Sequence, residues 1–282
     1  MSKEAERNPA NAAGDWYIDT NCIDCAAARE VAPGLIVRRG GKSVFGRQPA
    51  TREEEHMAWR AALLCPTASV GRTRGGKPPS DLFPQEIAPG VFRCGYNALS
   101  SFGAHSYFVA RKEGNLLVDS PRYVNHLVEA FEKAGGIADV LLTHRDDVAD
   151  ADRYANHFSA RVWIHEYDAD AAPYATNILK GTAATEIDAE LSAVPVPGHT
   201  KGSVIYLLSR TYLFTGDTLA WDPERKSLTA FRQACWYSWS ELKRSLARLE
   251  VPFEWLLPGH GHSHHLHAQD MREHLRALVG AM

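Results

Sequence analysis

The sequence has little excess of charge of either sign and no long apolar run. Its 282 residues include 31 lysines and arginines and 34 aspartates and glutamates, so the net charge is -3 with neutral histidines. A nucleic-acid or anionic-membrane surface needs a basic patch, and this balance disfavours both partners. No apolar segment approaches a membrane span, and residues 1–6 lack the layout of a secretory signal. We therefore expect a cytoplasmic protein with a small-molecule partner.

Cysteine is also scarce, with five residues in the whole chain. An odd number of scattered cysteines in a cytoplasmic protein disfavours structural disulfides and favours metal or cluster ligation. The apolar fraction of 45% and the charged fraction of 23% are those of an ordinary globular protein. The length fits one large domain with or without a small one.

Residues 71–81 are rich in glycine, proline and basic side chains, which predicts a linker. We expect a first domain over residues 1–75 and a second over residues 82–282. The first contains a Cys-Ile-Asp-Cys turn and a predicted helix over residues 52–64. Its marginal core would gain stability from a metal or from docking onto the larger domain. The second begins with short strands and then alternates strands with helices, which predicts an α+β fold with helices outside a mixed sheet.

Four predicted strands of the second domain are followed by a side chain that can bind metal. His144 follows an apolar strand, His199 lies in a Pro-Gly-His-Thr turn, Asp217 in a Phe-Thr-Gly-Asp turn, and His260 in a Pro-Gly-His-Gly turn. Each string alone is more often an ordinary turn, but four of them in one chain predict a metal centre. Imidazole with carboxylate suits zinc or ferrous iron.

Together with a Leu-Val-Asp-Ser string at residues 117–120, these turns resemble the five ordered motifs of the metallo-beta-lactamase superfamily. The resemblance implies an αββα sandwich with metal at the sheet edge. His144, His199 and Asp217 would bind one ion, His260 would complete a second site, and Asp119 would orient a ligand histidine. An open coordination position would then generate a metal-bound hydroxide as the nucleophile.

The segment after His144 departs from this family. The usual His-x-His-x-Asp-His pattern would occupy residues 144, 146, 148 and 149, where the chain has histidine, aspartate, valine and alanine. A local shift would make Asp146 or Asp147 a metal ligand or a catalytic group. The equally weighted alternative makes one of them the N-cap of the next helix. If that helix starts here, Asp147 and Asp150 share a face. We expect one ion of zinc or iron rather than two.

Lys201, Trp221 and Trp236 are the candidates for substrate contact. They lie in or near an aromatic, basic loop that would wall a pocket beside the metal. The alternative for each is simple packing or solvation of a loop. The segments 167–190 and 220–238, where specificity would lie, contain no recognisable motif.

Cys22, Cys25 and the later Cys65-Pro66 pair resemble a single-cluster bacterial ferredoxin, which implies a small ferredoxin-like α+β domain before the sandwich. The third cysteine position holds Ala28, so a four-cysteine cluster requires a ligand from Cys94 or elsewhere. A three-iron cluster, a lone zinc ion and an empty relic all stay open. An intact cluster would bring a redox partner.

These observations support three hypotheses. The first is a metal-dependent hydrolase that acts on an ester, thioester or amide. The second is a mononuclear non-haem iron oxygenase that acts on a thiol or persulfide, because two histidines and one carboxylate are its ligand set. Persulfide dioxygenases, a branch of the superfamily resembling glyoxalase II, use that set. The third is a non-catalytic redox or binding protein with a decayed site.

Overall fold

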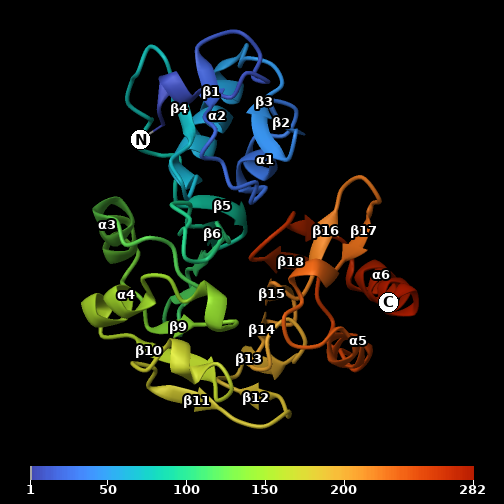
Figure 1. The fold of residues 1–282 in the computed structure, drawn as a ribbon. Helices are drawn as coiled ribbons and strands as arrows, with labels where there is room; N and C mark the ends of the chain where they lie inside the picture. The colour runs from blue at the N-terminus through green and yellow to red at the C-terminus, as the bar shows by residue number, and fades with distance from the viewer. Residues whose placement is uncertain (1) are drawn as a thin grey trace.

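A computed structural model describes residues 2–282 as an α+β fold, which confirms the predicted class (Figure 1). The α-helices are α1 (Ala27–Val31), α2 (Arg52–Leu64), α3 (Asn125–Lys133), α4 (Ala151–Phe158), α5 (Trp239–Ala247) and α6 (Ala268–Ala281). Short 3-10 helices span Glu4–Glu6, Arg145–Asp147, Ala169–Ala171 and Arg232–Ala234. The strands are β1 (Trp16–Ile18), β2 (Ile36–Arg39), β3 (Lys42–Phe45), β4 (Val70–Arg72), β5 (Gln85–Ala88), β6 (Val91–Arg93), β7 (Tyr107–Val109), β8 (Leu116–Val118), β9 (Asp139–Leu141), β10 (Arg161–His165), β11 (Asn177–Leu179), β12 (Thr185–Glu186), β13 (Leu191–Pro195), β14 (Val204–Leu208), β15 (Tyr212–Gly216), β16 (Ala220–Asp222), β17 (Ser227–Thr229), β18 (Trp255–Pro258) and β19 (His264–His265).

Two large sheets form the body of the protein. One has the strand order β11-β10-β9-β8-β7-β6-β5, and the other β12-β13-β14-β15-β18-β19. Buried side chains from both sheets make one core between them, including Tyr107, Leu141, Tyr206, Phe214 and Leu257. This inner core joins the sheets face to face.

Helices α3, α4, α5 and α6 cover the outer faces of the two sheets (Figure 1). Leu127 and Phe131 of α3 and Tyr154 of α4 pack on the first sheet, because their spacing gives each helix one apolar face. On the second sheet, buried residues of α5 and α6 such as Leu242 and Met271 do the same. The layers are therefore αββα, as the resemblance implied.

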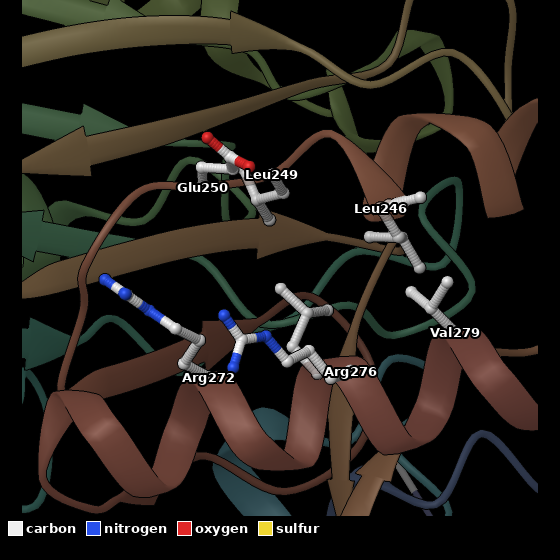
Figure 2. Close-up of a pocket in the computed structure, with 8 residues that line it drawn as sticks. Leu246, Leu249, Glu250, Arg272, Arg276 and Val279 are labelled. Carbon is white, nitrogen blue, oxygen red and sulfur yellow. The ribbon is translucent and has the colours of Figure 1, made fainter.

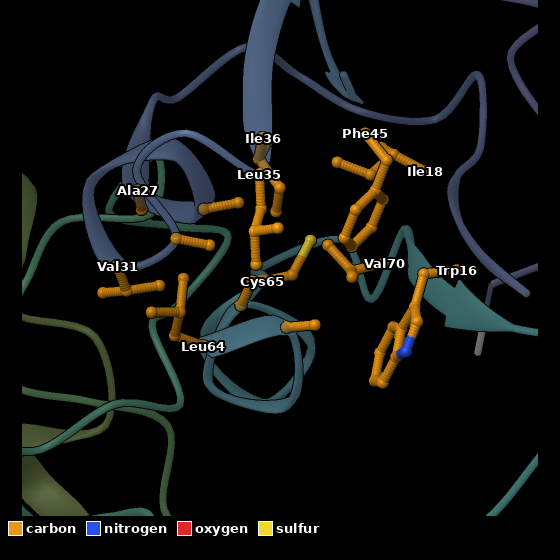
Figure 3. Close-up of a cluster of buried hydrophobic side chains, with 14 of the residues drawn as sticks. Trp16, Ile18, Ala27, Val31, Leu35, Ile36, Phe45, Leu64, Cys65 and Val70 are labelled. Atoms are coloured by element: carbon orange, nitrogen blue, oxygen red, sulfur yellow. The ribbon is translucent and has the colours of Figure 1, made fainter. Parts of the chain in front are cut away.

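The N-terminal segment has its own apolar cluster, in which Trp16, Leu35, Phe45 and Leu64 are buried (Figure 3). It contains the two-stranded pairs β1-β4 and β2-β3 with helices α1 and α2. Helix α2 has the predicted bounds, and its N-cap Thr51 accepts a hydrogen bond from the backbone N–H of Glu54.

The division into domains stays a prediction, and two observations bear on it. Gly71 and Arg72, at the start of the expected linker, lie in β4 and pair with β1. Leu82 and Phe83, just after it, pack into the N-terminal cluster. The N-terminal core thus uses residues on both sides of the expected linker.

The helix after His144 starts later than one of our expectations required. Helix α4 begins at Ala151 with Asp150 at its N-cap, while Asp147 lies in the preceding 3-10 turn. The condition under which Asp147 and Asp150 would share a helix face is therefore not met, and the predicted N-cap role of Asp146 or Asp147 is wrong. The Asp150 carboxylate instead accepts a hydrogen bond from the backbone N–H of Tyr123.

Within residues 2–282 no helix is both long enough and apolar enough to cross a membrane.

Candidate metal centre

Four strand ends bring the predicted ligands to one edge of the sandwich. His144 follows β9, His199 lies between β13 and β14, Asp217 follows β15, and His260 follows β18. One ligand atom from each of His144, His199 and Asp217 lies within 4.8 Å of the other two. Over residues 2–282 this is the single group of three or more histidine, cysteine or acidic residues that meets this distance.

The atoms of this group face one another without partners. Oδ2 of Asp217 lies 3.9 Å from Nε2 of His144 and 3.7 Å from Nε2 of His199. Both Nε2 atoms and Oδ1 of Asp217 are buried, and no group in residues 2–282 bonds to them. Buried polar atoms are seldom left unpaired, and two imidazole nitrogens with a carboxylate are the donor set of a zinc or iron site. The residues therefore fit a metal ion.

Thr143 connects Asp119 to His144. The Thr143 hydroxyl donates to the Asp119 carboxylate at 2.9 Å and lies 3.0 Å from Nδ1 of His144. Because the single hydroxyl proton points at Asp119, the hydroxyl oxygen accepts from Nδ1–H of His144. That tautomer leaves the lone pair of Nε2 turned toward Asp217. Asp119 thus contacts His144 through Thr143 and not directly.

The turn that carries His199 is fixed by a residue that sequence reasoning missed. The buried carboxylate of Asp168 accepts hydrogen bonds from the Thr200 hydroxyl at 2.6 Å and from the backbone N–H of Arg145 at 3.1 Å. A Cβ atom at Gly202 would lie 2.5 Å from Cγ of Asp168, so this position requires glycine. Asp168 thereby joins the turns of both ligand histidines, but no local motif marks it.

Asp146 and Asp147 enter the site in different ways. Oδ2 of Asp146 lies 3.3 Å from Nε2 of His199 and 3.9 Å from Nε2 of His144, and the side chain is partly exposed. Asp147 is buried with Oδ2 unpaired within residues 2–282. A Cβ atom at Gly259 would lie 2.9 Å from both this oxygen and Oδ1 of Asp217. Nε2 of His260 lies 3.8 Å from Oδ2 of Asp217.

Burial and neighbouring charges shift the pKa values of these groups in different directions. Burial lowers the pKa of His144 to about 4, so its imidazole is neutral at pH 7. Burial raises the pKa of Asp147 well above 3.8, and Asp217 and Asp119 raise it further. Burial also raises the pKa of Asp217, but His260, His144 and His199 lower it by more. A cation would relieve the repulsion among these carboxylates and favour their ionised forms.

A cavity of about 950 Å³ opens onto this centre. Its lining includes Asp146, Asp147, His199, Asp217 and His260 from the metal group. Apolar and polar walls come from Ser100, Ser101, Phe102, Ala230, Phe231, Arg232, Gln233, Ala234, Trp236 and Gly261, and the N-terminal segment adds Asp24, Cys25, Ala26 and Glu30. No local pattern in the sequence indicates the N-terminal contribution.

Of the three predicted substrate-contact residues, the cavity includes Trp236 alone. Its indole is 69% exposed and its ring centroid lies 6.3 Å from that of His199. Nζ of Lys201 instead lies 3.7 Å from the ring centroid of Tyr167, and Trp221 stacks on His264 at 3.7 Å. The structure therefore does not place Lys201 or Trp221 in this cavity.

Two other hollows lie away from the metal group. One of about 560 Å³ is lined by Trp221 and by His262, His264 and His274. The other, of about 360 Å³, lies between α5 and α6, where Arg272 and Arg276 border an apolar floor that includes Leu246 and Leu249 (Figure 2). Neither includes a residue of the metal group.

The three N-terminal cysteines gain no fourth thiolate from Cys94. Cys22, Cys65 and Ala28 are buried in the N-terminal cluster, and Figure 3 shows Cys65 among its apolar side chains. Cys94 packs in the separate core beneath α3 and α4. The residues present therefore do not fit a four-cysteine cluster. A lone zinc ion on Cys22, Cys25 and Cys65 is also unsupported, because their sulfur atoms do not meet the 4.8 Å distance.

Comparisons with known proteins find relatives for both parts of the chain. Residues 18–72 match the family model of the 4Fe-4S single cluster domain of ferredoxin I. A hydroxyacylglutathione hydrolase of Acidiphilium cryptum is 34% identical over 119 residues, or 41% of this chain, and the match spans 49% of that enzyme's length.

Solved metallo-beta-lactamases have the same fold. DIM-1 metallo-beta-lactamase is 20% identical with a TM-score of 0.52, over 70% of this chain and 96% of that one. The metallo-beta-lactamase of Pontibacter korlensis is 18% identical with a TM-score of 0.51, over 70% and 98% of the two chains.

Proposed function

Because the chain has the metallo-beta-lactamase fold behind a ferredoxin-like segment, we propose that it is a metal-dependent hydrolase of a small ester or thioester. The observation that carries the proposal is the unpaired, buried group of His144, His199 and Asp217 at the mouth of a large cavity. A zinc ion held there would lower the pKa of a bound water and polarise a carbonyl oxygen. A small-molecule thioester is favoured by the likeness to a hydroxyacylglutathione hydrolase.

The chain's own groups have distinct roles in this proposal. Asp146 is partly exposed to the cavity, and its pKa is lowered, chiefly by His199, whose Nε2 lies 3.3 Å from Oδ2 of Asp146. An ionised carboxylate at this position would accept the proton of the attacking water. Phe102, Phe231 and Trp236 would hold the apolar part of the substrate, and Arg232 would bind a carboxylate on it.

Asp147 and His260 would form a second half-site with Asp217. Their positions around Gly259 support a carboxylate ligand supplied by Asp147 in place of the aspartate and histidine expected at residues 148 and 149. The burial of Asp147 favours its protonated form, so this half-site is the weaker one. We therefore keep one ion as the expected content.

A second candidate is a mononuclear iron oxygenase that acts on a thiol or persulfide. It is favoured by the ligand group itself, since two histidines and one carboxylate with open positions are typical of non-haem iron. The ion that the purified protein contains, and the substrate that it turns over, separate the two candidates.

The test combines metal analysis with two assays. We expect about one zinc ion per chain and hydrolysis of a hydroxyacyl thioester of glutathione, and we expect both to be lost in His199→Ala. The matched control is His157→Ala, which removes a surface histidine that bonds to Glu132. Iron with oxygen uptake on a persulfide would support the second candidate instead. A protein without bound metal would contradict both, and full metal content in His199→Ala would refute the site.

A further inference from the structure

We propose that Glu30, in the ferredoxin-like segment, positions the turn that carries His260 and so makes that segment a working part of the metal centre. The proposal goes beyond the hydrolase assignment, although it rests on that assignment for the ion that His260 would face. Glu30 would be a positioning residue, since it acts through the turn and not on the substrate.

The Glu30 carboxylate is buried where the two parts of the chain meet. Its side chain is 4% exposed, and each oxygen bonds to a residue of the sandwich. Oε2 lies 2.7 Å from Nε2 of His105, and Oε1 accepts from the backbone N–H of Gly261 at 3.1 Å. Gly261 directly follows His260, so one of the two contacts is on the ligand-bearing turn itself.

His105 connects Glu30 to the other side of the same turn. Its backbone N–H donates to the carbonyl of Gly259 at 2.7 Å, on the residue before His260. The Asn97 amide nitrogen lies 3.2 Å from Nδ1 of His105 and donates to the carbonyl of Gly103 at 2.7 Å. With Asn97 as the donor at Nδ1, Nε2 carries the hydrogen that His105 donates to Glu30. Glu30 thus holds the turn through both residues that flank His260.

The remaining contacts of this turn come from the sandwich. The Tyr107 hydroxyl donates to the carbonyl of Pro258 at 2.6 Å, and the backbone N–H of Gly259 donates to the carbonyl of Gly216 at 2.8 Å. These bonds fix the start of the turn, on the strand side. The bond from Glu30 fixes its end, where the chain leaves His260.

The neighbouring N-terminal residues close the same cavity. Asp24, Cys25 and Ala26 line it beside Glu30. A Cβ atom at Gly103 would lie 2.9 Å from Sγ of Cys25 and 3.0 Å from Cγ of Pro66. The loop that leads to His105 therefore packs directly against the cysteine turn and Pro66. This close contact holds Glu30 at a fixed position relative to the His260 turn.

The test measures zinc affinity by competition with a chelator rather than turnover. Nε2 of His260 lies 3.8 Å from Oδ2 of Asp217, so a displaced His260 turn would disturb that ligand of the single ion. We therefore expect Glu30→Gln to weaken binding about 10-fold or more, as loss of an outer partner of a metal site does. The control Glu53→Gln makes the same change of charge at an exposed residue of α2 and should leave affinity unchanged. In a His260→Ala background, Glu30→Gln should have no further effect, because Glu30 acts through His260.

Glu30→Asp covers the case in which the glutamine variant fails to fold. It keeps the charge but is one methylene shorter, so it cannot reach His105 and Gly261 together, and we expect weaker zinc binding in a folded protein. Wild-type affinity in either variant, or an equal loss with and without His260, would overturn the proposal.

If the wild-type protein binds no zinc, the hydrolase proposal fails by itself. The His260 imidazole signals in the metal-free protein, compared by NMR between wild type and Glu30→Asp, then decide the positioning role: a change supports it and identical signals overturn it.

Discussion

At the scale of single residues, the proposed metal centre depends on side chains that would set the direction of a ligand. Thr143 is the clearest example, because its hydroxyl lies between the Asp119 carboxylate and Nδ1 of His144. Burial raises the pKa of Asp119 to about 8, although its hydrogen bonds with Thr143 act in the opposite direction. The hydroxyl therefore both fixes the His144 tautomer and satisfies a buried carboxyl group.

Replacing Thr143 by valine should weaken zinc binding about 10- to 100-fold, because the imidazole of His144 loses the acceptor of its Nδ1–H. The unfolding free energy should also fall by about 1–3 kcal/mol, since a buried polar group loses its partner. Chelator competition and chemical denaturation measure the two effects. Thr143→Ser keeps the hydroxyl and should retain zinc affinity near the wild-type value. A valine variant that binds zinc as the serine variant does would show that the hydroxyl has no orienting role.

At the scale of elements, the proposed ligands lie on tight turns that leave no room for a further side chain. Gly259 lies between two strand ends, and a Cβ atom there would meet oxygens of both Asp147 and Asp217 at 2.9 Å. The turn can thus approach the two acids only because the residue before His260 is glycine.

Gly259→Ala should displace the carboxylates of Asp147 and Asp217 and lower zinc affinity about 10-fold or more. The matched control is Gly280→Ala near the end of α6, where an added Cβ has no neighbour within 4 Å. That variant should bind zinc normally, and its helix should gain slightly in stability. Equal affinities of the two alanine variants would contradict the close approach of the acids at Gly259.

The cysteine turn leads to a prediction about the N-terminal segment. Three thiols are present in its cluster, and Ala28 occupies the third cysteine position of the ferredoxin pattern within an apolar environment. Anaerobic treatment with iron and sulfide should therefore yield less than the four iron atoms per chain of a complete cluster. Iron and sulfide analysis after removal of excess reagent measures this. Four iron and four sulfide per chain would mean that a group other than a cysteine of this turn completes the cluster.

Many of the helices, strands and turns could be predicted from the sequence, because local patterns of apolar and turn residues determine them. The bounds of α2 and the strand ends before His144, His199, Asp217 and His260 follow from apolar spacing and turn residues. Lys201 and Trp221 lie outside the lining of the cavity, because nearness in sequence says little about which way a loop side chain points. Glu30 was missed because its partners lie 75 and 231 residues away, and no local pattern records so distant a contact.

At the scale of the whole molecule, the N-terminal segment and the sandwich share a buried carboxylate. Burial raises the pKa of Glu30, but His105, His262 and Arg93 act more strongly and lower it to about 2. Burial and Arg93 hold the pKa of His105 below 6.5, so at neutral pH its contact with Glu30 is a hydrogen bond from a neutral imidazole. The interface therefore depends on an ionised carboxylate.

This arrangement predicts a loss of stability in acid. The pKa of Glu30 is lower in the folded protein than its ordinary value of 4.5, so its ionisation stabilises the fold above about pH 5 and this contribution fades as the pH falls toward about 2. The contribution is about 3 kcal/mol at neutral pH. The difference in unfolding free energy between wild type and Glu30→Gln should therefore shrink by that order between pH 6 and pH 2. A difference that does not change with pH would contradict an ionised Glu30 at the interface.

Trp236 offers a way to observe the centre directly. Its indole is the most exposed of the large apolar side chains at the cavity, at 69%, and it lies beside His199, whereas Trp16 and Trp221 are buried. A small dissolved quencher such as acrylamide would reach this indole first, and an occupant of the cavity would shield it. The protein thus contains its own optical reporter, whose emission would register the arrival of a ligand without any attached label.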